Sequence, residues 1–152
     1  MSSADSGPTF SAPHVVEYDY RRSVGPVLGR FFTELRERRI VGIRRDNGSV
    51  LVPPAEYDPD SGESLSEIVP VGPTGVVASW AWVSKPSAKH PLDRPFAWAL
   101  IRLDGADTAL LHAVDTGRES AMSTGMRVRP RWREATKGEI HDIECFEPED
   151  AS

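Results

Sequence analysis

The residues whose spacing says most about chemistry lie in two glycine-terminated turns on either side of a Pro-Pro pair, between Gly42 and Gly62. Two turns of this kind can place four ligands around a structural zinc ion, because tetrahedral zinc needs soft ligands that converge. The four positions with the required spacing are Arg44, Asn47, Asp58 and Ser61. None is a thiolate and one is a cation, so the sequence predicts that no metal binds there.

Without zinc, these two turns need another source of stability. A structural zinc ion contributes on the order of ten kcal/mol to the folding of a small module. We expect an ion pair between Arg44 and Asp58 to cross the former metal position, and contacts with a partner to help order the segment. The side chains expected to pack beneath it are Ile43, Val50, Val52 and Tyr57.

The remaining reactive residue types form no catalytic arrangement. The histidines show no metal-ligand spacing; His112 is expected to be a satisfied strand residue, and His90 alone lies in a loop at a binding edge. Cys145 has no basic neighbour in the sequence that would lower its pKa, so we expect it to be inert. The acidic cluster from Glu56 to Glu63 lacks the regular oxygen spacing of a calcium loop. The sequence therefore predicts a non-catalytic chain with no catalytic residues.

Two further patterns predict binding surfaces. Arg127, Arg129 and Arg131 alternate along one strand, so their guanidinium groups should line one face and could hold phosphates or an acidic partner; a solvated strand face is the alternative. The strands 75–83 and 95–103 are apolar on both faces, which indicates either cover by the same chain or docking of another protein. Stacking of nucleic-acid bases on the tryptophans is a third interpretation. The residues that we predict for a partner interface are Phe31, Phe32, Tyr57, Trp80, Trp82, Phe96 and Trp98.

Composition limits the class of protein. The chain has 152 residues, 39% of them hydrophobic and 27% charged, as in an ordinary protein of one domain or one two-part unit. A formal net charge of −5 argues against a general nucleic-acid binder. The single cysteine agrees with a reducing cytoplasm. The apolar runs are too short for a bilayer, and the N-terminus shows no signal peptide.

The elements that must position these residues can be predicted from periodicity. Residues 1–16 are expected to be a disordered tail. Apolar residues at three- and four-residue spacing predict a helix capped by Ser23 and ending near Arg39, with Pro26 in its first turn. Short strands at 40–43 and 49–52 follow, then an acidic loop from Tyr57 to Glu67. Alternating apolar segments separated by turn signals predict barrel strands at 75–83, 95–103, 108–114, 126–132 and 140–146.

In this order the segments resemble a known family, the acyl-CoA-associated OB-fold proteins that accompany thiolase-like and lipid-transfer-protein enzymes. The resemblance covers roughly residues 20–148. It includes the helical lead-in from Tyr20, the ribbon with its Pro-Pro pair, the strand from Gly75 to Val83, and the Gly125-Met126 strand entry. It implies a mainly β fold with three parts: an N-terminal helix with a degenerate, zinc-less ribbon over 17–71, and a five-stranded OB barrel over 72–148. The absent thiolates are the departure from the family pattern.

The resemblance also implies a function. The chain would be an accessory subunit of a thiolase-superfamily enzyme that cleaves a carbon–carbon bond of acyl-CoA or steroid-CoA thioesters, as in sterol side-chain degradation. It would bind no cofactor itself, and an α2β2 heterotetramer is expected. The alternatives are a single-stranded nucleic-acid binding OB module and an accessory subunit of an acyl-CoA hydratase.

Overall fold

The N-terminal helix is shorter than the sequence predicts. The structure, a computed structural model, describes residues 25–150, so the predicted tail and Ser23 lie outside the described residues. Helix α2 spans Pro26–Arg36, with Gly25 as its N-cap. The carboxylate of Glu56 accepts hydrogen bonds from the backbone N–H groups of Val27 (3.3 Å) and Leu28 (2.9 Å). A side chain from a distant loop therefore satisfies the first helical donors and places a negative charge at the positive end of the helix.

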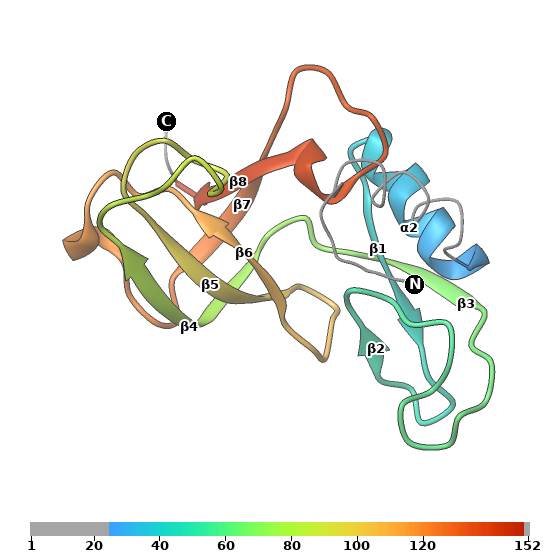
Figure 1. Cartoon of the computed structure of the whole chain (residues 1–152). Coiled ribbons are helices and arrows are strands. Elements are labelled where there is room, and N and C mark those ends of the chain that lie inside the picture. The colour runs from blue at the N-terminus through green and yellow to red at the C-terminus, as the bar shows by residue number, and fades with distance from the viewer. Residues whose placement is uncertain (1–24, 151–152) are drawn as a thin grey trace, which may run out of the picture.

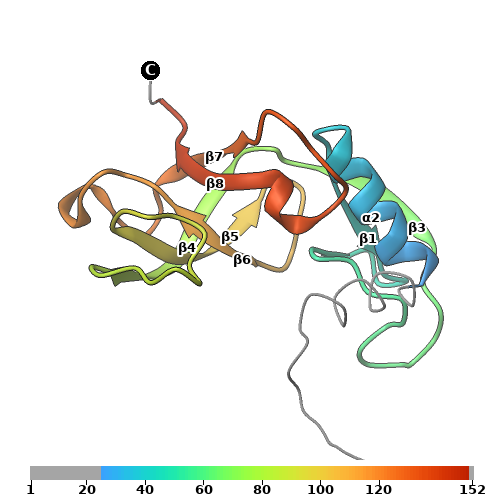
Figure 2. The ribbon, with the colours of Figure 1, turned by 45° about the horizontal axis from the view of Figure 1, so that its top comes forward.

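A small antiparallel sheet lies beneath this helix. It contains β1 (Ile40–Arg44), β2 (Val50–Leu51) and β3 (Glu67–Val71) in the order β2-β1-β3. Figure 2 shows α2 lying against this sheet, at one end of the molecule. Sequence analysis missed β3, because Pro70 and the acidic residues before it looked like a loop. Pro70 is tolerated here because β3 is an edge strand, where a missing N–H breaks no ladder.

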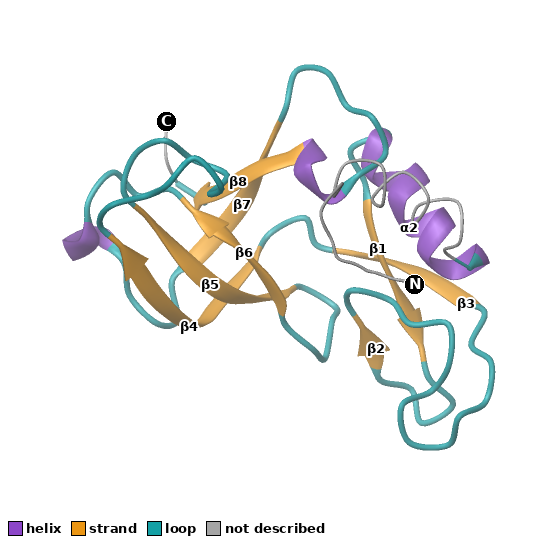
Figure 3. Ribbon diagram, in the orientation of Figure 1, coloured by secondary structure: helices purple, strands orange, loops and turns teal. Residues whose placement is uncertain are grey.

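The second half of the chain forms the barrel that the sequence predicts. Its strands are β4 (Gly75–Val83), β5 (Phe96–Leu103), β6 (Leu110–Val114), β7 (Arg127–Trp132) and β8 (Ile143–Pro148). They close in the order β4-β5-β6-β8-β7, with β6 and β8 parallel (Figures 1 and 3). The long connection between β6 and β7 includes the short 3₁₀ helix η1 (Glu119–Ala121). The mainly β prediction with an N-terminal helix and a five-stranded barrel is confirmed.

The last predicted strand begins too early. Residues Ile140–Asp142 form a 3₁₀ turn, η2, and β8 follows it. The cause is the fully buried carboxylate of Asp142, which accepts hydrogen bonds from the backbone N–H groups of Lys137 (2.8 Å), Gly138 (2.7 Å) and Glu139 (3.2 Å). A carboxylate that gathers three N–H groups favours a tight turn over an extended strand.

One hydrophobic core joins the two sheets. Phe31 and Leu35 of α2 and Val41 of β1 pack in the same cluster as Val77 and Ile101 of the barrel. The core thus continues across residues 71–72, where the sequence suggested a boundary between parts. None of the helices between residues 25 and 150 has the length and apolarity that a membrane crossing needs.

A β-bulge in β4 corrects the predicted alternation of its side chains. Val77 pairs with Ile101, but Ser79 pairs with the next residue, Leu100, so Ala78 is an extra residue. Beyond the bulge, Trp80 and Trp82 lie opposite Ala99 and Ala97. Because directly paired residues share a face, the two indoles lie on the same side as Val77, toward the core.

Candidate partner-binding surface

The two turns around the former zinc position are held by an ion pair, but not by the predicted one. Arg45, rather than Arg44, binds Asp58 through both ends of its guanidinium group, at 2.9 Å and 3.0 Å. Arg44 instead donates to Glu67 (3.0 Å) at the open edge of the sheet. Arg44 is the last residue of β1 and its side chain follows the strand, whereas Arg45 begins the turn and reaches across to the second one.

Asp58 is the centre of this arrangement. Its carboxylate also accepts hydrogen bonds from the backbone N–H groups of Asp60 (2.8 Å) and Ser61 (3.1 Å), and Asp60 joins Arg45 from the other side. The Arg45 hydrogen bond, followed by the N–H group of Asp60, holds the pKa of Asp58 far below its ordinary value. The pair is largely enclosed, with 16% of the Arg45 side chain and 9% of the Asp58 side chain exposed.

The glycines of both turns allow this geometry. Gly48 and Gly62 have φ angles of +91° and +77°, in the left-handed region that favours glycine. Within residues 25–150, no group of three or more His, Cys, Asp or Glu side chains could hold a metal ion. Tyr57, predicted to pack under the turns, is instead 62% exposed at their surface.

The predicted arginine row exists on β7, and each of the three members has acidic partners on the same chain. Arg127 pairs with Asp104 (2.7 Å) and Glu149 (2.9 Å), and Arg129 pairs with Glu147 (3.0 Å). Arg131 lies near three carboxylates, those of Asp115, Glu144 and Glu147, at 3.1–3.2 Å. Binding of phosphates or an acidic partner by this row stays a prediction, and an anion would have to compete with these carboxylates.

Asp104 and Asp115 show how firmly this ladder is paired. The Arg127 guanidinium group, then the Thr74 hydroxyl, lower the pKa of Asp104. Burial alone would raise the pKa of Asp115, but hydrogen bonds from Arg94 and Arg131 outweigh burial and lower it. Both carboxylates are therefore ionised at neutral pH and bind their arginines.

The predicted interface aromatics do not form one exposed surface. Phe31 and Phe96 are almost fully buried, with 2% and 0% of their surface exposed, so neither offers surface to a partner in this conformation. Phe32, Trp80 and Trp82 are half-buried against the main core. Trp98 lies on the opposite face of the sheet from the other two indoles and packs against Phe96, with ring centroids 5.4 Å apart. Only Tyr57 is widely exposed.

Sequence analysis missed the most exposed apolar side chains of the barrel. Leu100 on β5 and Leu111 on β6 are 41% and 59% exposed and lie directly opposite each other. Ala81 and Trp98 form the neighbouring pair of that sheet face. We call these residues the outer β4–β6 face: Ala81, Trp98, Leu100 and Leu111. The signal was present, because Leu100 and Leu111 fall at the polar-facing positions of otherwise alternating strands.

The loop of residues 84–95 covers one end of this face. Its Leu92 is buried with Phe96, Ala113 and Cys145 in a second hydrophobic cluster. The ring of His90 packs edge-on against Phe96, and its Nδ1 accepts a hydrogen bond from the backbone N–H group of Ser87 (2.8 Å). The loop edge where the sequence placed His90 is therefore folded onto the barrel.

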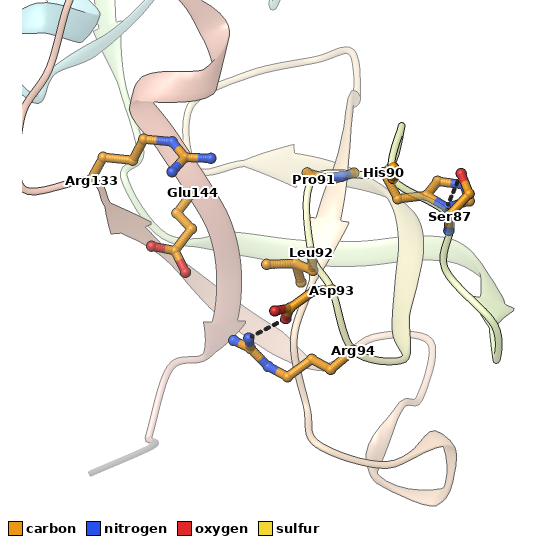
Figure 4. Close-up of a pocket in the computed structure, with 9 residues that line it drawn as sticks. Ser87, His90, Pro91, Leu92, Asp93, Arg94, Arg133 and Glu144 are labelled. Atoms are coloured by element: carbon orange, nitrogen blue, oxygen red, sulfur yellow. Dashed lines mark hydrogen bonds and ion pairs between the residues drawn. The ribbon is translucent and has the colours of Figure 1, made fainter.

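Beside this loop lies an open hollow of about 400 Å³. Figure 4 shows Arg94 and Asp93 turned toward each other on the loop side, while Arg133 and Glu144 come from the opposite wall. Arg94 also binds Asp115 at 2.5 Å, which fixes the end of the loop to the barrel. Charges of both signs line the hollow, so it selects no single ligand class.

The remaining reactive side chains are buried. Burial lowers the pKa of His112 to about 4, and its Nδ1 accepts a hydrogen bond from the N–H group of Ala113 (2.9 Å). It is the satisfied barrel residue that the sequence predicts. Burial raises the pKa of Cys145 to about 12, although Arg131 lies across the strand pair and acts in the opposite direction. The expected inert thiol is confirmed, but the expectation of no basic neighbour was wrong.

Comparison with known proteins follows this geometry. Residues 68–133 match the family model described as the C-terminal OB-fold domain of ChsH2. No curated protein matches the chain. A solved Ltp2-ChsH2(DUF35) aldolase is similar with a TM-score of 0.60 and 21% identity, over 83% of this chain and 97% of that one. A DUF35-family protein of unknown function from Sulfolobus solfataricus gives 0.58 and 21%, over 77% and 87%. At these identities the likeness to solved structures shows the fold.

Proposed function

We propose, from the premise that residues 68–133 belong to the ChsH2 C-terminal OB-fold family, that this chain is an accessory subunit of a thiolase-like aldolase. The family match is the observation that supports it most directly. The Ltp2-ChsH2(DUF35) aldolase, whose fold is similar over most of both chains, is described as an assembly with an enzyme partner. The partner would perform the chemistry, and this chain would support it.

The geometry agrees with an accessory role. Among residues 25–150, the groups whose pKa departs from its ordinary value are explained by burial or by ion pairs within the chain. The outer β4–β6 face meanwhile presents apolar side chains to solvent, which is typical of a surface that meets another protein. We assign the enzyme subunit to this face, with the exposed Tyr57 as a second contact.

The finer parts of the proposal rest on the resemblance in the sequence. The enzyme would cleave a carbon–carbon bond of an acyl-CoA or steroid-CoA thioester by retro-aldol or thiolytic chemistry. The CoA thioester would be a substrate of the complex, with no cofactor bound by this chain. An α2β2 heterotetramer in the cytoplasm, acting in sterol side-chain degradation, is the expected setting.

The test is capture of the partner from the native cell with a tagged full-length chain, followed by a high-salt wash. A thiolase-like protein at equal stoichiometry is the expected result. The variant Leu111→Asp should lose the partner, because it buries a charge in the contact. The variant Thr124→Asp adds the same charge at an exposed site on the β6–β7 connection and should retain it.

Three results would overturn the proposal in different ways. A stoichiometric hydratase would favour the hydratase subunit, and co-purifying nucleic acid would favour the nucleic-acid binding module. Equal capture by Leu111→Asp and the unaltered chain would leave the enzyme partner in place but remove the outer β4–β6 face as its binding surface.

A further inference from the structure

An unfilled groove lies between α2 and the edge of the small sheet. It measures about 420 Å³, and its floor is apolar, with Ile40, Val41, Ile68 and Val71 among its lining residues. β3 forms the sheet edge here, since it pairs with β1 alone. No element between residues 25 and 150 covers this groove, so its occupant must come from elsewhere.

The walls of this groove carry a positive charge. Arg30, Arg38 and Arg39 line it, and the only carboxylate among its lining residues is that of Glu34. Glu34 is shared between Arg30 (2.9 Å) and Arg39 (2.6 Å), and both arginine side chains remain more than half exposed. Arg38 donates only to the backbone carbonyls of Arg133 and Glu134. An occupant with apolar side chains and carboxylates is therefore complementary to the groove.

The chain itself contains such a segment directly before α2. Residues 15–20 read Val-Val-Glu-Tyr-Asp-Tyr. In an extended conformation Val16, Tyr18 and Tyr20 point to one side and Glu17 and Asp19 to the other. The apolar side matches the floor of the groove, and the carboxylates then face the long arginine side chains at its rim.

The length of chain outside the described residues allows this placement. From Arg30 to Arg39 the groove follows the helix for about 14 Å, at 1.5 Å per residue. The chain enters α2 at Gly25, so residues 20–24 must turn back along the helix by about one and a half turns. Five extended residues span up to about 17 Å, which is sufficient.

We propose that residues 15–20 of this chain lie extended in the groove between α2 and β3, antiparallel to the helix, with the tyrosines on its floor and Glu17 and Asp19 paired with the arginines at its rim. The contact goes beyond the proposed function, because it needs neither the enzyme nor its substrate. It fixes the approach to α2 and covers the edge strand of the small sheet.

The test is hydrogen exchange of the full-length chain, followed peptide by peptide. In the unaltered protein the amides of residues 15–20 should exchange at least about tenfold more slowly than in an unfolded peptide. The double variant Glu17→Lys with Asp19→Lys should lose this protection, and exchange in β3 should become faster. Neither change touches the described fold, so the variant retains its folded core. Asp5→Lys changes the same type of charge outside the segment and should have no effect.

A second variant addresses the groove from the other side. Pro70→Glu adds a carboxylate at an exposed residue that lines the groove, and it should release residues 15–20 by charge repulsion. Unprotected amides in residues 15–20 of the unaltered chain would overturn the proposal. So would protection that depends on protein concentration, which indicates a second copy as the occupant, or protection that arises only with an enzyme partner bound.

Discussion

At the scale of single residues, the most specific device in this protein is the Arg45–Asp58 pair. It joins two turns across a position where the sequence suggests a metal site without its ligands, and it does so with two hydrogen bonds in a largely enclosed place. Arginine suits this task because its planar group meets a carboxylate through two parallel N–H donors. Lysine offers a single point of contact and would not fix both turns.

The first prediction compares two neighbouring arginines. Arg45→Met should loosen residues 45–62, because the enclosed Asp58 carboxylate loses its counter-charge. Arg44→Met is the matched control and should change little, since its pair with Glu67 is open to solvent, with 41% and 63% of the side chains exposed. Hydrogen exchange in these turns and the melting temperature measure both effects. Equal effects of the two variants would show that Arg45 has no special role.

The second prediction concerns pH and His112. Its folded pKa, about 4, lies below the ordinary value of 6.5, so the unfolded chain binds a proton more readily than the folded one. Stability should therefore fall as the pH drops below about 6.5 and level off below the folded pKa. This histidine should account for roughly 2 kcal/mol of lost unfolding free energy between about pH 7 and pH 5.

The comparison with His112→Leu isolates this contribution. The variant removes the titrating ring, so its urea-unfolding free energy should lose less between the two pH values than that of the unaltered chain. A constant packing cost appears at both pH values and cancels in the difference. An identical pH dependence for both proteins would contradict the assignment of a neutral, buried His112.

At the scale of elements, the loop of residues 84–95 is held on the barrel by few anchors. Leu92 is buried in the second hydrophobic cluster, and Arg94 binds Asp115 where the loop returns to β5. Beneath it lie Phe96 and Trp98, which would otherwise extend the outer β4–β6 face. The loop therefore decides how much apolar surface this face presents.

The third prediction tests this anchoring. Leu92→Ala should cost about 2–3 kcal/mol if the loop unfolds with the barrel, since it removes buried methyl groups and leaves a cavity. The loop amides should exchange faster, and the fluorescence of Trp98 should shift toward that of an exposed indole. Lys89→Ala, at an exposed residue of the same loop, is the control. Unchanged exchange in the loop of Leu92→Ala would show that other contacts hold it.

At the scale of the whole molecule, charge separates the proposed function from one of its alternatives. The barrel resembles folds that bind single strands on aromatic platforms within a positive groove. Here the net charge is −5, and the arginines of β7 are paired with carboxylates of the same chain. A phosphate backbone would release few counterions from such a surface.

The fourth prediction follows from this charge balance. Fluorescence anisotropy with a labelled single-stranded oligonucleotide at low salt should show no saturable binding by the purified full-length chain. A single-strand binding protein of known affinity is the positive control. Saturable binding that weakens steeply with salt would favour the nucleic-acid binding module over the accessory subunit.

Periodicity and composition determined much of the architecture. Residues 27–35 repeat their apolar side chains at helical spacing, and the segments that form β4 to β7 alternate between clear turn signals, so α2 and most of the barrel could be predicted. Local signals also indicated that His112 would be a satisfied residue and Cys145 an inert thiol. These features depend on residues close in sequence, which is where pattern analysis is reliable.

Only the tertiary structure decided the contacts between distant segments. One extra residue, Ala78, shifts the facing of Trp80 and Trp82, and nothing in the local sequence marks that bulge. The choice of Arg45 over Arg44 as the partner of Asp58 depends on where β1 ends, and β3 exists because its edge position tolerates Pro70. The outer β4–β6 face follows from the strand register, which pairs Leu100 with Leu111. Register and chain crossing are set by the packing of the whole core, so the candidate surface could be located only in three dimensions.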